Sequence, residues 1–315
     1  QVENGALTVV GGYRALGRLY RGIICNDLRQ YVMLGDAGAM TDNVIGNADD
    51  RWVFTEDNPS RELSTAAALA AVSRVLKGFN DTLSVQSLQA ACELFDRTRV
   101  TDRSEINKLQ AAVELYLATH EDGYKKYILG QQKLIVDNIA RTGWFIGRAD
   151  QAIKDKKFTE NIRKALAAFR RELEEQKKET PYGVPYKPSI WGAGWDIQSF
   201  GYQQYFLVQA YPDLFGPELL YSALNFVLGC HPGSNTASFA SGVGANSATV
   251  AYGLNRADWS YIPGGVISGT AMIRPDFPEL LTFPFLWQQT EYVMGGGSSH
   301  YMFLVLAARQ LLGNK

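Results

Sequence analysis

The strongest constraint on the fold is a succession of segments whose apolar residues recur with the period of an α-helix. The segments follow one another as pairs, and none shows the strict alternation of a half-buried strand. A repeated helix pair without strands is typical of an all-α fold, plausibly a toroid of helical hairpins. We expect helices at about 9–20, 64–76, from 81 or 82 onward, 104–119, 122–140, 151–178, 195–211, 216–229, 285–293 and 298–312.

Local signals mark the ends of some of these helices. Ser64 is a good N-cap for the alanine-rich helix after it, and Gly78 ends that helix. Either Asp81 or Thr82 caps the next one. A toroid of six hairpins needs twelve helices, whereas roughly nine or ten are predicted here. We therefore expect 1–315 to form a single (α/α)6 domain that lacks its N-terminal helices.

Charge and cysteine content exclude several classes of protein. The chain has 31 basic and 32 acidic residues, and this balance predicts no nucleic-acid or anionic-membrane partner. No apolar run approaches the ~20 residues that span a bilayer. The three cysteines form no C-x-x-C motif, and we interpret them as small buried residues. They are Cys25, Cys92 and Cys230.

The first candidate site surrounds Glu291, which stands between an aromatic-rich turn and the glycine run 295–297. Glycine lets the backbone approach a ligand closely. Trp287 and Tyr292 would supply a low-polarity wall, which raises the pKa of a carboxyl group as a general acid requires. A glutamate that pairs with an arginine or caps a helix is the alternative.

Two further clusters combine aromatic side chains with glycine-rich loops. Trp191 and Trp195 lie in the first, where exposed rings would stack on sugars or would pin the loop to the core. Asp196 beside them is interpreted as a helix cap. The second is the long segment 230–284, whose hydroxyl, amide and aromatic side chains suit a hydroxyl-rich ligand. Its candidate contacts are Tyr252, Arg256 and Trp259.

An oxygen-rich loop is the only candidate for a metal site. Its side chains would suit a structural calcium ion, but their spacing matches no EF-hand, and a polar surface loop is the preferred interpretation. They are Asp42, Asn43, Asn47, Asp49 and Asp50. No cofactor is expected.

Taken in order, these segments resemble the catalytic domain of glycoside hydrolase family 9, over nearly the whole chain. The resemblance rests on four segments: 55–67 (TEDNPSRELSTAA), 182–195 with YGVPY and WGAGW, 228–233 (LGCHPG) and the terminal segment around Glu291. It implies an (α/α)6 barrel that hydrolyses β-glucans such as cellulose, mixed-linkage glucan or xyloglucan with inversion. Glu291 matches the general acid, and a secreted, periplasmic or cell-surface location is implied.

The sequence departs from the family pattern at several positions. The family's Asp before the acid falls on Thr282, and its Asn after it falls on Gly297. Its sugar-binding His falls on Tyr252 and its Arg on Leu254, so Arg256 is a candidate substitute. We interpret the segment 36–39 (DAGA) as an accidental match to the family's Asp-Ala-Gly-Asp motif, because too few residues separate it from the S-T-A-A helix. The resemblance therefore implies a base upstream of Gln1, and a missing N-terminal segment as partner.

Two other functions remain open. A non-catalytic carbohydrate-binding protein would keep the aromatic cleft without turnover. A helical scaffold would have no affinity for saccharides, although it would not need the aromatic and glycine-rich loops.

Overall fold

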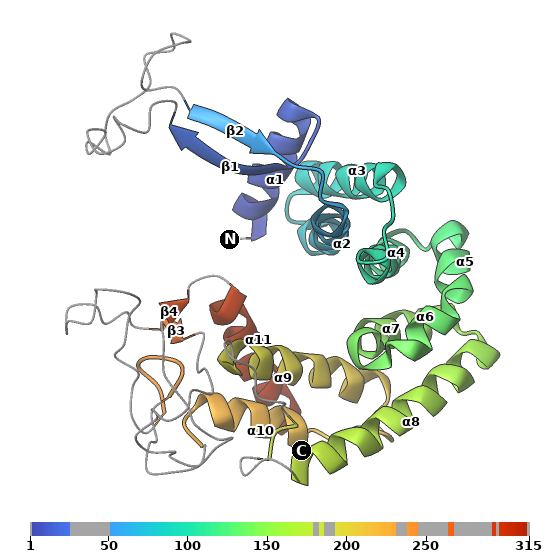
Figure 1. Ribbon diagram of the computed structural model, residues 1–315, viewed down its shortest axis with the longest axis vertical. Helices are drawn as coiled ribbons and strands as arrows, with labels where there is room; N and C mark the ends of the chain where they lie inside the picture. The colour runs from blue at the N-terminus through green and yellow to red at the C-terminus, as the bar shows by residue number, and fades with distance from the viewer. Residues whose placement is uncertain are drawn as a thin grey trace. The chain divides into compact units, whose positions relative to one another are not determined.

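The computed structural model describes residues 2–25, 51–178, 183–185, 193–230, 238–244, 264–267, 292–293 and 296–313. Contacts divide the chain into two compact units, Gln1–Leu134 and Ile135–Lys315. Both units are built from packed helices (Figure 1). The assignment of 1–315 to one domain stays a prediction.

The first unit is a stack of helices with α2 at its centre. Its helices are α1 (Val2–Leu16), α2 (Pro59–Leu76), α3 (Asp81–Arg97), α4 (Glu105–Thr119) and α5 (Asp122–Gly130), and α6 (Gln132–Asp137) spans the boundary between the units. Helix α2 packs on both α3 and α4. The Ser64 hydroxyl accepts a hydrogen bond from Asn107, and Arg74 forms an ion pair with the buried Glu114, so α2 and α4 run parallel.

Asparagine side chains, not the predicted residues, cap α2 and α3. The Asn58 side chain accepts a hydrogen bond from the Arg61 backbone at 3.1 Å, and Pro59 begins α2. Ser64 therefore lies inside the helix. Asn80 caps α3 in the same way, so the prediction of Asp81 or Thr82 is also wrong. Proline is favoured in the first turn because it has no N–H to satisfy there, and Asn58-Pro59 was the overlooked signal.

The described part of the second unit contains the helices α7 (Ile139–Ile153), α8 (Lys156–Lys178), α9 (Ala193–Ala210), α10 (Glu218–Val227) and α11 (Gly296–Gly313). The predicted helix 122–140 is replaced by α5, α6 and the start of α7, and the predicted helix 151–178 begins later, at Lys156. The reason for the second difference is that Lys154 takes a left-handed conformation that ends α7. The Asp155 side chain then caps α8 through the Phe158 backbone at 2.9 Å. The charged exposed face predicted for 151–178 is confirmed for α8, where ion pairs such as Lys164–Glu160 lie in solvent.

Helix α9 packs against α7, α10 and α11, while α8 packs against α7 and α10 also contacts α11. Two glycines permit the close approach. A Cβ at Gly147 would lie 2.8 Å from the Ala210 Cβ, and one at Gly201 would lie 2.9 Å from the Ala223 Cβ. Packing between helices two apart in the sequence, here and between α2 and α4, is the arrangement expected of stacked hairpins.

Two short antiparallel pairs add strands that the helical pattern did not predict. β1 (Tyr20–Cys25) pairs with β2 (Arg51–Thr55), and β3 (Val266–Ile267) pairs with β4 (Tyr292–Val293). The helix predicted at 285–293 is therefore wrong at its end, where two residues join a strand pair; 285–291 lie outside the described residues. A two-residue strand has too short a pattern to predict.

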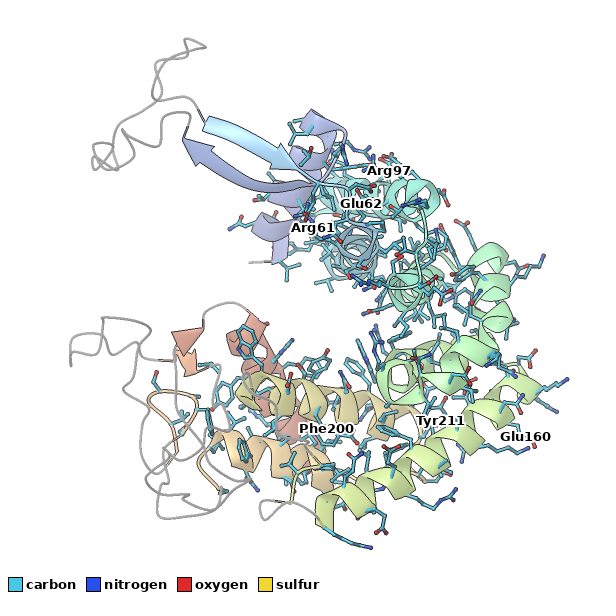
Figure 2. All side chains as sticks on the ribbon, in the orientation of Figure 1. Arg61, Glu62, Arg97, Glu160, Phe200 and Tyr211 are labelled. Atoms are coloured by element: carbon cyan, nitrogen blue, oxygen red, sulfur yellow. The ribbon has the colours of Figure 1, made fainter. Side chains whose placement is uncertain are left out.

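A buried network joins α7, α8 and α9. The Asp150 carboxylate accepts hydrogen bonds from Tyr211 at 2.8 Å and Thr159 at 2.5 Å, and the Arg163 guanidinium lies over the Tyr211 ring. Figure 2 shows Tyr211 at the junction of these helices. Burial, followed by the charge of Asp150, raises the pKa of Tyr211, which therefore stays a hydrogen-bond donor at physiological pH.

Tyr211→Phe should destabilise the protein by about 1.5–3 kcal/mol, since it removes a donor from a buried carboxylate. Urea unfolding would measure the loss. Tyr221→Phe in α10 is a matched control, because the buried Tyr221 hydroxyl has no hydrogen-bond partner within the described part of the chain. An equal loss for the two variants would contradict the importance of the network.

Candidate functional site

Most of the predicted site residues lie outside the described residues. These are Glu291, Trp191, Tyr252, Arg256 and Trp259, as well as the oxygen-rich loop at 42–50. Tyr292 has a described backbone in β4. Trp195 is half-buried in the first turn of α9. The site must therefore be built from the elements that flank the undescribed segments.

The strand pair β3–β4 determines where the residue after Glu291 lies. Val266 pairs with Val293 and Ile267 pairs with Tyr292, and β4 is followed by α11. Both strands contact α11. The backbone immediately after Glu291 is thus fixed beside the N-terminal part of this unit's last helix.

Residues 238–244, a described part of the long segment 230–284, lie against the same strand pair. Ala240 forms a bridge to Val266, and the Ser241 backbone donates to the Gly265 carbonyl at 2.9 Å. The hydroxyl groups of the segment 230–284 were expected to suit a hydroxyl-rich ligand, but Ser238 and Ser241 in this segment are both buried and bonded to backbone groups. They hold the loop in place, because buried hydroxyls must be satisfied internally.

A glycine and a stacked phenylalanine anchor this segment. Gly244 has a φ of +80°, and a Cβ there would lie 2.5 Å from the Leu228 carbonyl oxygen, so only glycine fits. The Phe239 ring stacks on the Phe226 ring of α10, with centroids 5.3 Å apart. The segment 238–244, strand β3 and helices α9, α10 and α11 therefore share one core in this unit.

Helices α9 and α11 bring two of the predicted clusters to the same end of the unit. They run parallel, because Ser199 meets His300 near their N-termini and Tyr205 bonds to Gln310 farther along. The cluster that contains Trp191 and Trp195, called the tryptophan-rich loop below, leads into α9 at this end. The segment that contains Glu291 leads into α11 at the same end. Asp196 lies inside the first turn of α9, three residues after the helix begins at Ala193, so the prediction that it caps this helix is wrong. Desolvation raises the pKa of its carboxyl group.

His300 of α11 lies at this end of the unit, although the sequence interpretation did not single it out. Its ring lies 4.9 Å from the Tyr202 ring, and its Nδ1 is 3.4 Å from the Ser199 hydroxyl. Burial lowers its pKa below the ordinary value, so the imidazole is neutral at neutral pH. The missing signal was long-range, because no motif in the sequence connects His300 to Ser199.

Aromatic side chains continue from this end along α7, α9 and α11. Trp144 of α7 contacts the rings of Tyr202 and Phe206 on α9, and Phe206 stacks on Phe303 of α11 at 5.5 Å. Aromatic faces of this kind either stack on sugar rings or pack as core.

The first unit contains a cavity, and none of the predicted sugar contacts is among the described residues that line it. It has a volume of about 430 Å³ and lies between α1 and α2, where its lining is mainly apolar, with Arg61, Ser64 and Thr65 as polar exceptions. Among the described residues that line it there is no carboxylate.

Metal, membrane and cysteine predictions have the following outcomes. Among the described residues, no three His, Cys, Asp or Glu side chains gather to hold a metal ion. None of the described helices is long and apolar enough to cross a bilayer.

Cys230 is exposed and Cys92 is half-buried. The prediction of buried cysteines is therefore wrong for Cys230, which follows the end of α10.

Comparison with known proteins decides the family. The profile of Glycosyl hydrolase family 9 matches residues 29–253. The chain belongs to this family. No curated protein sequence matches it.

Solved structures of family 9 endoglucanases share the fold. A metagenome-derived endoglucanase has 18% identity and a TM-score of 0.62, and the match covers 82% of this chain and 54% of that one. A termite endoglucanase from Nasutitermes takasagoensis has 17% identity and a TM-score of 0.61, with coverages of 99% and 84%. A single mutant of the thermostable endoglucanase from Alicyclobacillus acidocaldarius has 14% identity and a TM-score of 0.66, with coverages of 93% and 61%.

These comparisons confirm the all-α, (α/α)6-type fold predicted from the sequence. This family 9 chain spans about half the length of the metagenome-derived endoglucanase. The family match ends at residue 253, before Glu291, so the role of that glutamate stays a prediction.

Proposed function

We propose that this chain is the larger, C-terminal part of an inverting β-glucan hydrolase in which Glu291 is the general acid. Membership of family 9 is the observation that carries the proposal. The convergence of the tryptophan-rich loop and the Glu291 segment on the N-terminal ends of α9 and α11 supports it.

The mechanism needs two carboxyl groups on opposite sides of the scissile bond. Glu291 would protonate the glycosidic oxygen, while a base would activate water on the other face, about 6.5–9.5 Å away. We assign the base to an Asp in a segment upstream of Gln1. No cofactor takes part, since the reaction requires only proton transfer and attack by water.

Substrate contacts would come from the aromatic and polar side chains around the acid. Trp191, Trp195, Trp259 and Tyr292 would stack on sugar rings, and Tyr252 and Arg256 would bind hydroxyl groups. The substrate class is a β-linked gluco-oligosaccharide or polysaccharide, and the proposed location is secreted, periplasmic or cell-surface. Cellobiose occupies the related cellulase Cel9M of C. cellulolyticum in one of the similar structures.

The 315-residue chain alone should hydrolyse barley β-glucan at least about 100-fold more slowly than the full-length protein, because a missing general base costs about 10²–10⁴-fold. Release of reducing sugar would measure both rates. Addition of the upstream segment should restore activity. Turnover by the chain alone at the rate of the full-length protein would contradict the assignment of the base.

A glucan-binding measurement made beside this assay separates hydrolysis from binding alone. A non-catalytic binder would retain glucan affinity, show no turnover in the full-length protein and be insensitive to Glu291→Gln. A helical scaffold would not bind glucan in either form.

A further inference from the structure

One face of α9 carries a row of ring and hydroxyl side chains toward the candidate site. Trp195, Ser199 and Tyr202 follow the i, i+4, i+7 spacing that places side chains on a single helical face. Trp195 and Tyr202 are half-buried, so part of this face is open to solvent. Trp195 belongs to the tryptophan-rich cluster itself, and it lies one turn before Ser199.

His300 of α11 meets that face between Ser199 and Tyr202. Its Nδ1 lies 3.4 Å from the Ser199 hydroxyl, and its ring is tilted by 38° against the Tyr202 ring. These two contacts fix the plane and the direction of the imidazole. Helix α11 begins just after β4, so His300 stands on the first helix downstream of Glu291.

The second ring nitrogen of His300 is the unused group. Within the part of the chain that the structure describes, Nε2 has no hydrogen-bond partner, and no carboxylate there forms an ion pair with the ring. A neutral imidazole has one donor and one acceptor nitrogen. With Nδ1 engaged by a hydroxyl, Nε2 is left to bind a group that can both donate and accept, as a sugar hydroxyl can.

We propose that His300 is a substrate-binding residue, whose Nε2 hydrogen-bonds a hydroxyl of a glucosyl unit stacked on Trp195. Ser199 and Tyr202 orient the imidazole for this contact. The proposal rests on the proposed function, because it names a subsite of the same β-glucan hydrolase. It adds a specificity residue from α11 that no motif indicated.

The test compares three variants of the full-length protein in a Glu291→Gln background, so that binding is measured without turnover. His300→Phe keeps the packing on Tyr202 but cannot hydrogen-bond, and His300→Gln restores a donor and an acceptor. Tyr205→Phe is the structural control, since it removes another α9–α11 hydrogen bond, the one to Gln310 at 2.9 Å. Calorimetry with cellotetraose would give each dissociation constant.

His300→Phe should weaken cellotetraose binding about tenfold, which corresponds to about 1.4 kcal/mol. His300→Gln should recover most of this loss, and Tyr205→Phe should bind like the parent. In the active full-length protein, His300→Phe should raise KM more than it lowers kcat.

Two outcomes would overturn the proposal alone: unchanged affinity in His300→Phe, or an equal loss of affinity in Tyr205→Phe, which would indicate a general effect of helix packing. A parent protein that does not bind cellotetraose would overturn the proposed function as well. Full turnover by Glu291→Gln with a tenfold loss in His300→Phe would overturn only the assignment of the acid.

Discussion

Glu291→Gln is expected to lower kcat on β-glucan by about 10²–10⁴-fold in the full-length protein, because glutamine has the shape of glutamate but no proton to give. KM should change little, since the side chain keeps its size and its hydrogen-bonding capacity. Release of reducing sugar under saturating substrate would measure the effect.

The leaving group supplies a sharper form of this experiment. A dinitrophenyl cellobioside releases dinitrophenolate, a leaving group that needs no protonation. Glu291→Gln should therefore lose far less activity on this substrate than on β-glucan. A residue that only binds substrate would lose activity equally on both. Equal losses would therefore remove Glu291 from the role of general acid.

Glu160→Gln is the matched control for the loss of a carboxylate. Glu160 is exposed on α8, where Figure 2 labels it, and its ion pair is with Lys164 of the same helix. An ion pair this exposed contributes little to stability, because solvent screens the two charges. The variant should hydrolyse both substrates at the parent rate.

Phe226→Ala should destabilise the protein by about 3–5 kcal/mol, as expected for the loss of a fully buried aromatic ring. Phe226 is 1% exposed, and it belongs to the same core as Phe239, Val266 and Leu304. This core joins α10 and α11 to the segment 238–244 and to β3, so the substitution should also loosen the backbone beside the candidate acid. Urea unfolding would measure the stability.

Phe226→Leu tests how much of this loss comes from the empty space and how much comes from the loss of the aromatic ring. Leucine fills most of the space, and the expected cost falls below about 1.5 kcal/mol. Cellotetraose binding should weaken in Phe226→Ala at temperatures where the protein is still folded, and much less in Phe226→Leu. A loss of under 1 kcal/mol in Phe226→Ala would show that this core does not hold the segment.

Some of the local structure was predictable from neighbouring residues alone. The alternation of charged and apolar residues in α8 buries Phe158, Ile162 and Leu166 on one side, because residues three and four apart share a helical face. The helix 104–119 was predicted to within a residue for the same reason. The cap at Asn58 was also present in the sequence, beside Pro59, although the serine that followed was preferred.

The segments that resemble family 9 were equally visible in the sequence, and the family is confirmed. The function of individual side chains was less accessible. Ser238 and Ser241 have the chemistry of ligand contacts, yet both are buried and satisfied by backbone groups. A serine looks the same in the sequence whether its hydroxyl contacts a ligand or a backbone carbonyl. Only the surroundings of the side chain distinguish these two roles.

The sequence by itself determined the helices, their amphipathic faces and the family, because these depend on spacing within one segment. The tertiary structure decided the pairing of β3 with β4 and the contact of His300 with Ser199, which lies 101 residues away. Such contacts depend on how whole helices pack, as at Gly147 and Gly201, where the absence of a side chain sets the distance between helices. Periodicity within a segment carries no information about that distance.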